Sequence, residues 1–192
     1  MILVTCHWWI FALWAAFLIY WAIAGIFVKR GVDRGALRRG MAMRFALFLV
    51  IVTALLFARR SADLQAIQWA ELHSVPMAAT GAALVTFGAI VAFTARGAIG
   101  RNWGSPGMRK TDTELVTHGP YSLVRHPIYS GILLMMVGTA IGLTPIWWFV
   151  AGAAGIYFVT SARAEESYMA ERFPDAYPAY KARTKMLVPF LL

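Results

Sequence analysis

Four long stretches of this chain contain no charged residue, and they limit what it can fold into. They run from Met1 to Val28, from Phe45 to Ala58, from Leu72 to Ala95 and from His126 to Ala162. Charged residues make up 14% of the 192 residues and hydrophobic residues 60%, which leaves too few charges to cover a soluble domain. A helix crosses the hydrocarbon core of a bilayer with about 20 apolar residues, so the stretches predict an integral membrane protein.

The number of spans follows from the lengths of these stretches. The second stretch is short, but Arg44 and Arg59 at its ends could extend to the two interfaces. The last stretch is long enough for two helices. Pro145 near its middle lacks an amide donor and disfavours helix at Thr144, which predicts a tight hairpin. We therefore expect an all-α fold with about five transmembrane helices, near residues 8–28, 42–58, 75–95, 127–143 and 145–161.

The segment after the last span is amphipathic. Its apolar and aromatic residues recur along one helical face, at Met169, Phe173, Tyr177 and Tyr180. This spacing predicts a C-terminal amphipathic helix at the cytosolic surface. Pro174 and Pro178 should break it into short pieces.

The net charge of +9 would suggest a nucleic-acid partner in a soluble protein, but here its distribution indicates orientation. Basic residues cluster after the first span, between the third and fourth spans, and after the fifth. The positive-inside bias places the amino terminus outside and the long loops and tail in the cytoplasm. We expect a bacterial inner membrane, contacts of the basic segments with anionic membrane lipids, and no nucleic-acid partner.

The chain reads as a single domain over residues 1–192 whose two halves differ in character. Residues 1–95 form scaffold spans, and Gly138 and Gly142 in the fourth span should permit close helix packing. Residues 97–192 are richer in polar and basic groups and form the predicted cofactor-binding half. No metal site is expected.

The block from Leu115 to Gly131 places a cation, an imidazole and two phenols at one membrane boundary. Pro127 suits the first turn of a helix, because its missing amide would have no partner there. The free amides of that turn, with Arg125 and His126, predict a site for a small anion such as a carboxylate. The plainer interpretation is that Arg125 and His126 anchor the helix among headgroups.

Glu165 and Glu166 are two adjacent carboxylates beside the bilayer in a mostly basic chain. They either form a solvated first turn of the tail helix or receive an ammonium group opposite Arg125 and His126. An α-amino acid ligand would present both charges together.

Three motifs, in their order and spacing, resemble the isoprenylcysteine carboxyl methyltransferase family, whose superfamily includes the membrane phospholipid methyltransferases. They are the block 115–131 (Leu-Val-Thr-His-Gly-Pro-Tyr-Ser-Leu-Val-Arg-His-Pro-Ile-Tyr-Ser-Gly), the Glu165-Glu166 pair and the stretch 173–184. The resemblance covers roughly residues 97–189. It implies S-adenosylmethionine as cofactor and methyl transfer at the cytosolic face to a membrane-dissolved acceptor, either an isoprenylcysteine-like carboxylate or a phospholipid amine.

The resemblance also implies which residues bind the cofactor. Its binding residues would be Leu115, Val116, His118, Gly119, Tyr121, Arg125, His126, Pro127, Tyr129, Glu165 and Glu166. For catalysis we expect Glu166 to accept a proton or orient the acceptor, and Arg163 or Arg183 to hold an acceptor carboxylate or phosphate.

Two other functions remain open from the sequence. One is a membrane reductase that uses a nicotinamide cofactor, since some sterol reductases resemble this C-terminal architecture. The other is a non-enzymatic accessory protein in the membrane, which would bind neither cofactor.

Overall fold

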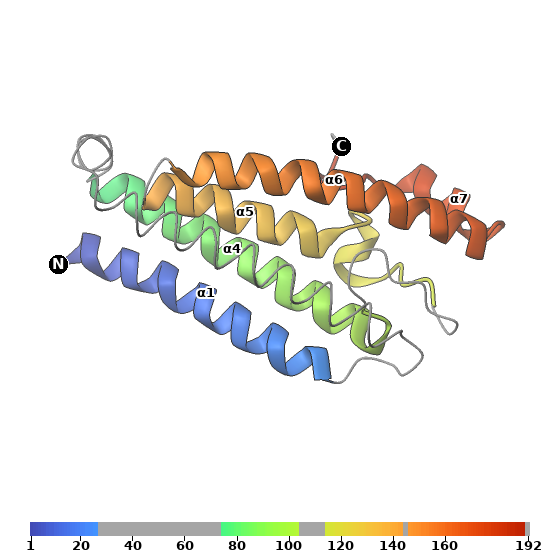
Figure 1. The fold of residues 1–192 in the computed structure, drawn as a ribbon, viewed down its shortest axis with the longest axis horizontal. Helices are drawn as coiled ribbons and strands as arrows, with labels where there is room; N and C mark the ends of the chain where they lie inside the picture. Colours follow the sequence, from blue (N-terminus) through green and yellow to red (C-terminus); the bar gives the residue numbers. More distant parts are fainter. Residues whose placement is uncertain (27–73, 104–113, 144–145, 191–192) are drawn as a thin grey trace.

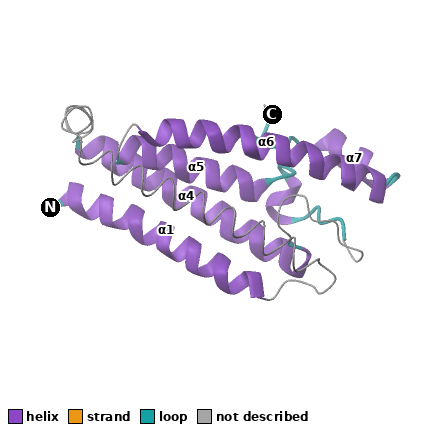
Figure 2. Cartoon of the chain, in the orientation of Figure 1, coloured by secondary structure: helices purple, strands orange, loops and turns teal. Residues whose placement is uncertain are grey.

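The computed structural model describes residues 1–26, 74–103, 114–143 and 146–190, and all its regular elements in these ranges are helices (Figures 1 and 2). Four long helices lie side by side: α1 (Ile2–Ile26), α4 (Val75–Ile99), α5 (Pro127–Gly142) and α6 (Ile146–Arg172). Three short elements complete them: η1 (Gly100–Asn102), η2 (Gly119–Ser122) and α7 (Ala176–Arg183). Figure 1 places α7 at the end of the bundle far from the amino terminus, where α4 ends and α5 begins.

The helices α4 and α5 begin and end where local chemistry permits. The Ser74 hydroxyl accepts a hydrogen bond from the Met77 amide at the start of α4, and Pro76 lies in its first turn. The helix stops at Gly100, whose positive φ of 52° closes the last turn. Helix α5 starts with Pro127, as expected for a residue without an amide donor.

The closest packing in the bundle joins α4 to α5. A Cβ added to Gly81 would lie 2.5 Å from the carbonyl oxygen of Gly138 and 2.5 Å from the Cα of Gly142. The two backbones therefore touch, and the predicted packing role of Gly138 and Gly142 agrees with their position. Gly81 of α4 is their partner.

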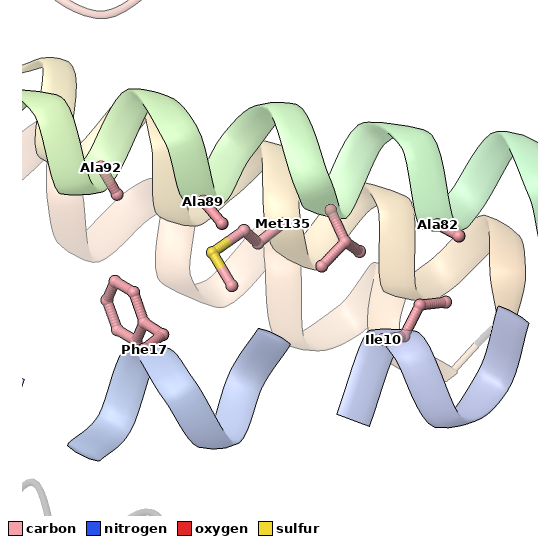
Figure 3. Close-up of a cluster of buried hydrophobic side chains, with 7 residues drawn as sticks. Ile10, Phe17, Ala82, Ala89, Ala92 and Met135 are labelled. Carbon is pink, nitrogen blue, oxygen red and sulfur yellow. The ribbon is translucent and has the colours of Figure 1, made fainter. Parts of the chain in front are cut away.

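Helix α1 packs against this pair through aromatic and aliphatic side chains. In Figure 3, Phe17 of α1 lies near Ala89 of α4 and Met135 of α5, and Ile10 of α1 lies near Ala82 of α4. Trp14 also donates a hydrogen bond from Nε1 to Thr139 Oγ1 at 3.0 Å. Hydrogen bonds between helices are useful where lipid offers no polar partner, though each contributes only about 0.6 kcal/mol on average.

Several predicted boundaries can be compared with the described helices. Helices α4 and α5 lie where the third and fourth spans were predicted, and α1 begins at Ile2 rather than near residue 8. By length and composition, Ile2–Ala24 and Val75–Ile99 are suited to crossing a membrane among the described residues. The predicted span 42–58 and the turn at residues 144–145 lie outside the described residues.

The C-terminal predictions need two corrections. Helix α6 continues to Arg172 instead of ending near residue 161, so Glu165 and Glu166 belong to it and not to the start of a tail helix. Pro174 does separate α6 from α7, but Pro178 lies in the first turn of α7 and does not break it. The amide groups in the first turn of a helix have no acceptor within the helix, so a proline there removes no hydrogen bond.

The contact at Gly81 predicts a specific sensitivity. Gly81→Ala places a methyl group against backbone atoms that cannot move aside, so we expect it to lower the free energy of unfolding by about 1–3 kcal/mol. Gly152→Ala in α6 is the matched control, because a Cβ there meets nothing within 4 Å. Thermal unfolding of the purified protein in detergent measures both, and equal unfolding midpoints for the two variants would contradict the packing described here.

Candidate functional site

The polar groups singled out from the sequence meet at the end of the bundle where α5 begins. The η2 turn holds Tyr121 with 6% of its surface exposed, packed with Ala95 of α4 and Ile128 of α5. The turn starts at Gly119, whose φ of 61° is in the left-handed region that glycine adopts readily. The Tyr180 hydroxyl of α7 donates a hydrogen bond to the Tyr121 carbonyl at 2.8 Å. These contacts join α4, α5 and α7 through one turn.

Arg125 is the centre of the cluster. Its Nε lies 2.6 Å from Glu166 Oε1, and the two side chains are only 8% and 5% exposed. Its Nη1 donates to the carbonyl oxygens of Thr184 and of Lys181, the latter at 3.4 Å. The guanidinium thus connects the segment before α5 to α6, to α7 and to the segment after α7.

Glu166 is surrounded by three basic side chains. Besides Arg125, Lys181 Nζ lies 3.0 Å from Oε2, and His126 Nε2 lies 3.5 Å from Oε1. Burial alone would raise the pKa of the Glu166 carboxyl, but the contacts with His126, Arg125 and Lys181 outweigh it and lower the pKa to about 2. A carboxylate held this firmly in its charged form is a weak proton acceptor.

His126 lies between the two carboxylates. Its Nδ1 is 3.5 Å from Glu165 Oε2, while Nε2 faces Glu166. Burial lowers the pKa of this imidazole, but the contacts with Glu165 and Glu166 have the larger combined effect, so the pKa is raised. The imidazole ring stacks on Tyr129 with 5.5 Å between centroids and 5° between planes.

Glu165 is the more accessible carboxylate, with 31% of its side chain exposed against 5% for Glu166. The Tyr129 hydroxyl donates to Glu165 Oε1 at 2.6 Å. Tyr129 in turn stacks on Phe158 with centroids 4.6 Å apart. Sequence reasoning missed Phe158, although it precedes Glu165 by seven residues, two helical turns, and therefore shares its face of α6.

The segment after α7 covers the start of α5. The amide of Arg125 donates to the Lys185 carbonyl at 2.8 Å, and the amide of His126 donates to the Met186 carbonyl at 3.0 Å. These two amides are therefore not available to an anion. The predicted anion site rested on the amides of the first turn of α5, which follow these two, so that part stays a prediction. The side chains of Arg125 and His126 lie beside the carboxylates of Glu165 and Glu166.

A depression of about 380 Å³ opens beside the cluster between α6 and α7. Its lining residues are Arg163, Glu166, Ser167, Ala170, Lys181 and Met186. The Arg163 side chain is exposed and has no ion-pair partner among the residues that the structure describes. Arg183, the other predicted cation, lies over the Tyr180 ring at 5.8 Å and does not line the depression.

The stretch before η2 has no regular secondary structure, and residues 115–117 are half-buried. Val116 packs near Tyr121, and His118 is exposed. Among the described residues, the backbone groups of Leu115, Val116 and Thr117 form no hydrogen bonds with one another or with neighbouring segments. The structure therefore brings Tyr121, Arg125, His126, Pro127, Tyr129, Glu165 and Glu166 into one connected cluster, with residues 115–119 beside it and Arg163 at its edge.

Comparison with known proteins identifies the family. The model of the phospholipid methyltransferase family matches residues 76–176, just over half of the chain. The chain belongs to the phospholipid methyltransferase family. The matched segment contains η2, α5, α6 and all of α4 but its first residue, and so includes every carboxylate and basic group of the cluster except Lys181.

Relatives of this phospholipid methyltransferase family member are similar over part of their length. Protein-S-isoprenylcysteine O-methyltransferase B of Arabidopsis thaliana is 35% identical over 85 residues, covering 43% of this chain and 43% of the relative. Protein-S-isoprenylcysteine O-methyltransferase of Mus musculus is 33% identical over 133 residues, covering 67% of this chain and 47% of the relative. The chain thus spans about half the length of the curated relatives it matches.

A solved structure shares the fold. It is the eukaryotic intramembrane Ras methyltransferase, an isoprenylcysteine carboxyl methyltransferase, with a TM-score of 0.61. The match is 24% identical and covers 73% of this chain and 52% of the other. Together with the family match, it confirms an all-helical methyltransferase-family architecture.

The position of His126 predicts a pH-dependent stability. Because its pKa is raised on folding, its contribution is complete below the unfolded value of about 6.5 and is lost as pH rises through the folded pKa. We expect His126→Gln to cost about 1–3 kcal/mol near pH 6, and distinctly less near pH 9. Denaturant unfolding of both proteins at the two pH values measures this, with His118→Gln, an exposed histidine, as control. The same cost at both pH values would contradict a charged His126.

Proposed function

We propose that this protein transfers a methyl group from S-adenosylmethionine to an acceptor dissolved in the membrane. The observation that carries the proposal is the cluster of Glu165, Glu166 and His126, together with residues 115–117 before η2, whose backbone forms no backbone hydrogen bond among the described residues. Family membership and the methyltransferase names of the relatives support it. The acceptor is of one of two classes, an isoprenylcysteine-like carboxylate or a phospholipid amine.

The residues present fit a donor that carries an amino-acid end. An α-ammonium group needs an accessible carboxylate, and Glu165 offers one that is partly exposed. An adenosine group needs hydrogen-bonding edges, and the backbone of Leu115, Val116 and Thr117, which forms no backbone hydrogen bond within the described part of the chain, offers them. His118, Gly119 and Tyr121 would complete that wall. When bound, S-adenosylmethionine supplies a methyl group activated by a sulfonium centre, which is the hard part of the chemistry.

We assign different roles to the two glutamates. Glu165 receives the ammonium group, because it is the accessible carboxylate. Glu166 and Arg125 position the segments that form the pocket, because each already binds the other in a buried pair. Glu166 remains close enough to the depression to orient an acceptor, and Arg163 on its rim is better placed than Arg183 to hold an acceptor carboxylate or phosphate.

We further propose five transmembrane spans, with the amino terminus outside and the site at the cytoplasmic face. In Figure 1, α1 and α4 end at the same end of the bundle where α5 begins. The basic residues of the sequence concentrate in the segments that leave this end. Both acceptor classes suit a site at the membrane surface, since their polar group would lie at the interface and their chains in lipid.

A binding experiment separates this proposal from the alternatives. Calorimetric titration of the purified protein with S-adenosylmethionine and, separately, with NADPH distinguishes a methyltransferase from a nicotinamide-dependent reductase. An accessory protein would bind neither. Incubation with the labelled methyl donor and a lipid extract, followed by identification of the labelled product, then defines the acceptor.

The role of Glu165 predicts the effect of its substitution. Glu165→Gln removes the charge that faces the donor ammonium, so we expect its affinity for S-adenosylmethionine to fall about tenfold or more, since a hydrogen bond to a charged group contributes about 1.5–3 kcal/mol. Glu171→Gln, an exposed glutamate further along α6, is the matched control. Arg163→Ala should instead raise the KM for the acceptor. Unchanged donor affinity in Glu165→Gln would remove Glu165 from the donor site.

A further inference from the structure

The two carboxylate oxygens of Glu166 have different neighbours. Oε1 lies 2.6 Å from Arg125 Nε and 3.5 Å from His126 Nε2, and both of these basic side chains are nearly buried. Oε2 lies 3.0 Å from Lys181 Nζ, and the Lys181 side chain is 54% exposed. One side of the carboxylate therefore has partners that are held by the fold, and the other has a partner that can leave.

Lys181 also lines the depression, where an anionic group could become its second partner. It lines the hollow of about 380 Å³ together with Arg163, which has no ion-pair partner among the described residues. The one carboxylate in the lining, Glu166, is already paired with Arg125. The depression thus has an excess of positive charge, which favours a carboxylate or phosphate group as its occupant.

We propose that Lys181 is an exchangeable counter-ion. It breaks its contact with Glu166 and then binds the anionic group of the acceptor together with Arg163. This inference rests on the proposed function and names a residue of the acceptor site that the sequence reading did not include. The shared chemistry is a carboxylate or phosphate at the membrane surface. A lysine suits this exchange, because its flexible chain carries a point charge that can rotate between two partners.

The exchange links the two substrates. When Lys181 turns to the acceptor anion, the acidic pair Glu165 and Glu166 loses one of its basic neighbours. His126 contacts both carboxylates, so the change extends from Glu166 to Glu165. The two carboxylates then bind a cationic donor more tightly. By reciprocity, a bound donor raises the affinity of the protein for the acceptor anion by the same factor.

The coupling can be measured by binding alone. S-adenosylhomocysteine, the unreactive product of the donor, is titrated into protein held in phosphatidylcholine nanodiscs, with and without an anionic lipid. One arm adds phosphatidic acid, which presents a phosphate, and the other adds N-acetyl-S-farnesylcysteine, which presents a carboxylate. The methyl ester of N-acetyl-S-farnesylcysteine, which lacks the charge, is the neutral control. The measured quantity is the ratio of the Kd without the anion to the Kd with it.

For the unaltered protein we expect a ratio of about five or more in at least one arm, and near one with the ester. Lys181→Met should lower the ratio to near one while S-adenosylhomocysteine still binds, and Lys181→Arg should restore it. Lys185→Met, an exposed lysine outside the depression, should keep the ratio of the unaltered protein.

Two results would overturn the inference alone: binding with a ratio near one in the unaltered protein, or a ratio that persists in Lys181→Met. If S-adenosylhomocysteine bound to no variant, the proposed function would be overturned, and the inference with it. The two failures are therefore distinguishable.

Discussion

The buried pair between Arg125 and Glu166 is the interaction on which the polar end of this protein depends. Two buried charges are expensive to remove from water, and their attraction offsets that cost only when the remaining hydrogen bonds are also made. Here Arg125 Nη1 donates to the carbonyl oxygens of Lys181 and Thr184, so the pair also holds the chain around it. Loss of one partner would leave a buried charge unpaired, at a cost of about 3–5 kcal/mol. The pair therefore sets the relative position of the segment before α5, of α6 and of the C-terminal segment.

The helix bundle supplies the platform for this pair by a different physical principle. Between helices in lipid there is little hydrophobic driving force, so close backbone contact becomes important. The contact of Gly81 with Gly138 and Gly142 holds α4 and α5 together. At the polar end the same two helices enclose Tyr121 between Ala95 and Ile128, so the position of the η2 turn follows from the packing in the bundle.

The sequence predicted the parts of this fold that depend on local chemistry. The charge-free runs and Pro127 located α4 and α5, because length, apolarity and the start of a helix are local properties. The end of α6 was missed because its apolar pattern stops while the helix continues through residues such as Ala164, Glu165 and Glu166, which have good helix propensity. The motifs also named the residues of the cluster, but not their pairing. That Arg125 binds Glu166, and that Lys181 joins them, depends on contacts between residues 41 and 15 positions apart, which local patterns do not encode.

The adjacency of the two glutamates has a geometric reason. Neighbouring residues on an α-helix point roughly 100° apart, so Glu165 and Glu166 cannot share one environment. Glu166 points to Arg125 and is 5% exposed, whereas Glu165 points to Tyr129 and is 31% exposed. His126 contacts both, so the two environments remain electrostatically connected. In the proposed function, one carboxylate holds the fold and the other receives the donor. The different exposures of Glu166 and Glu165 are what would allow an adjacent pair to divide these two tasks.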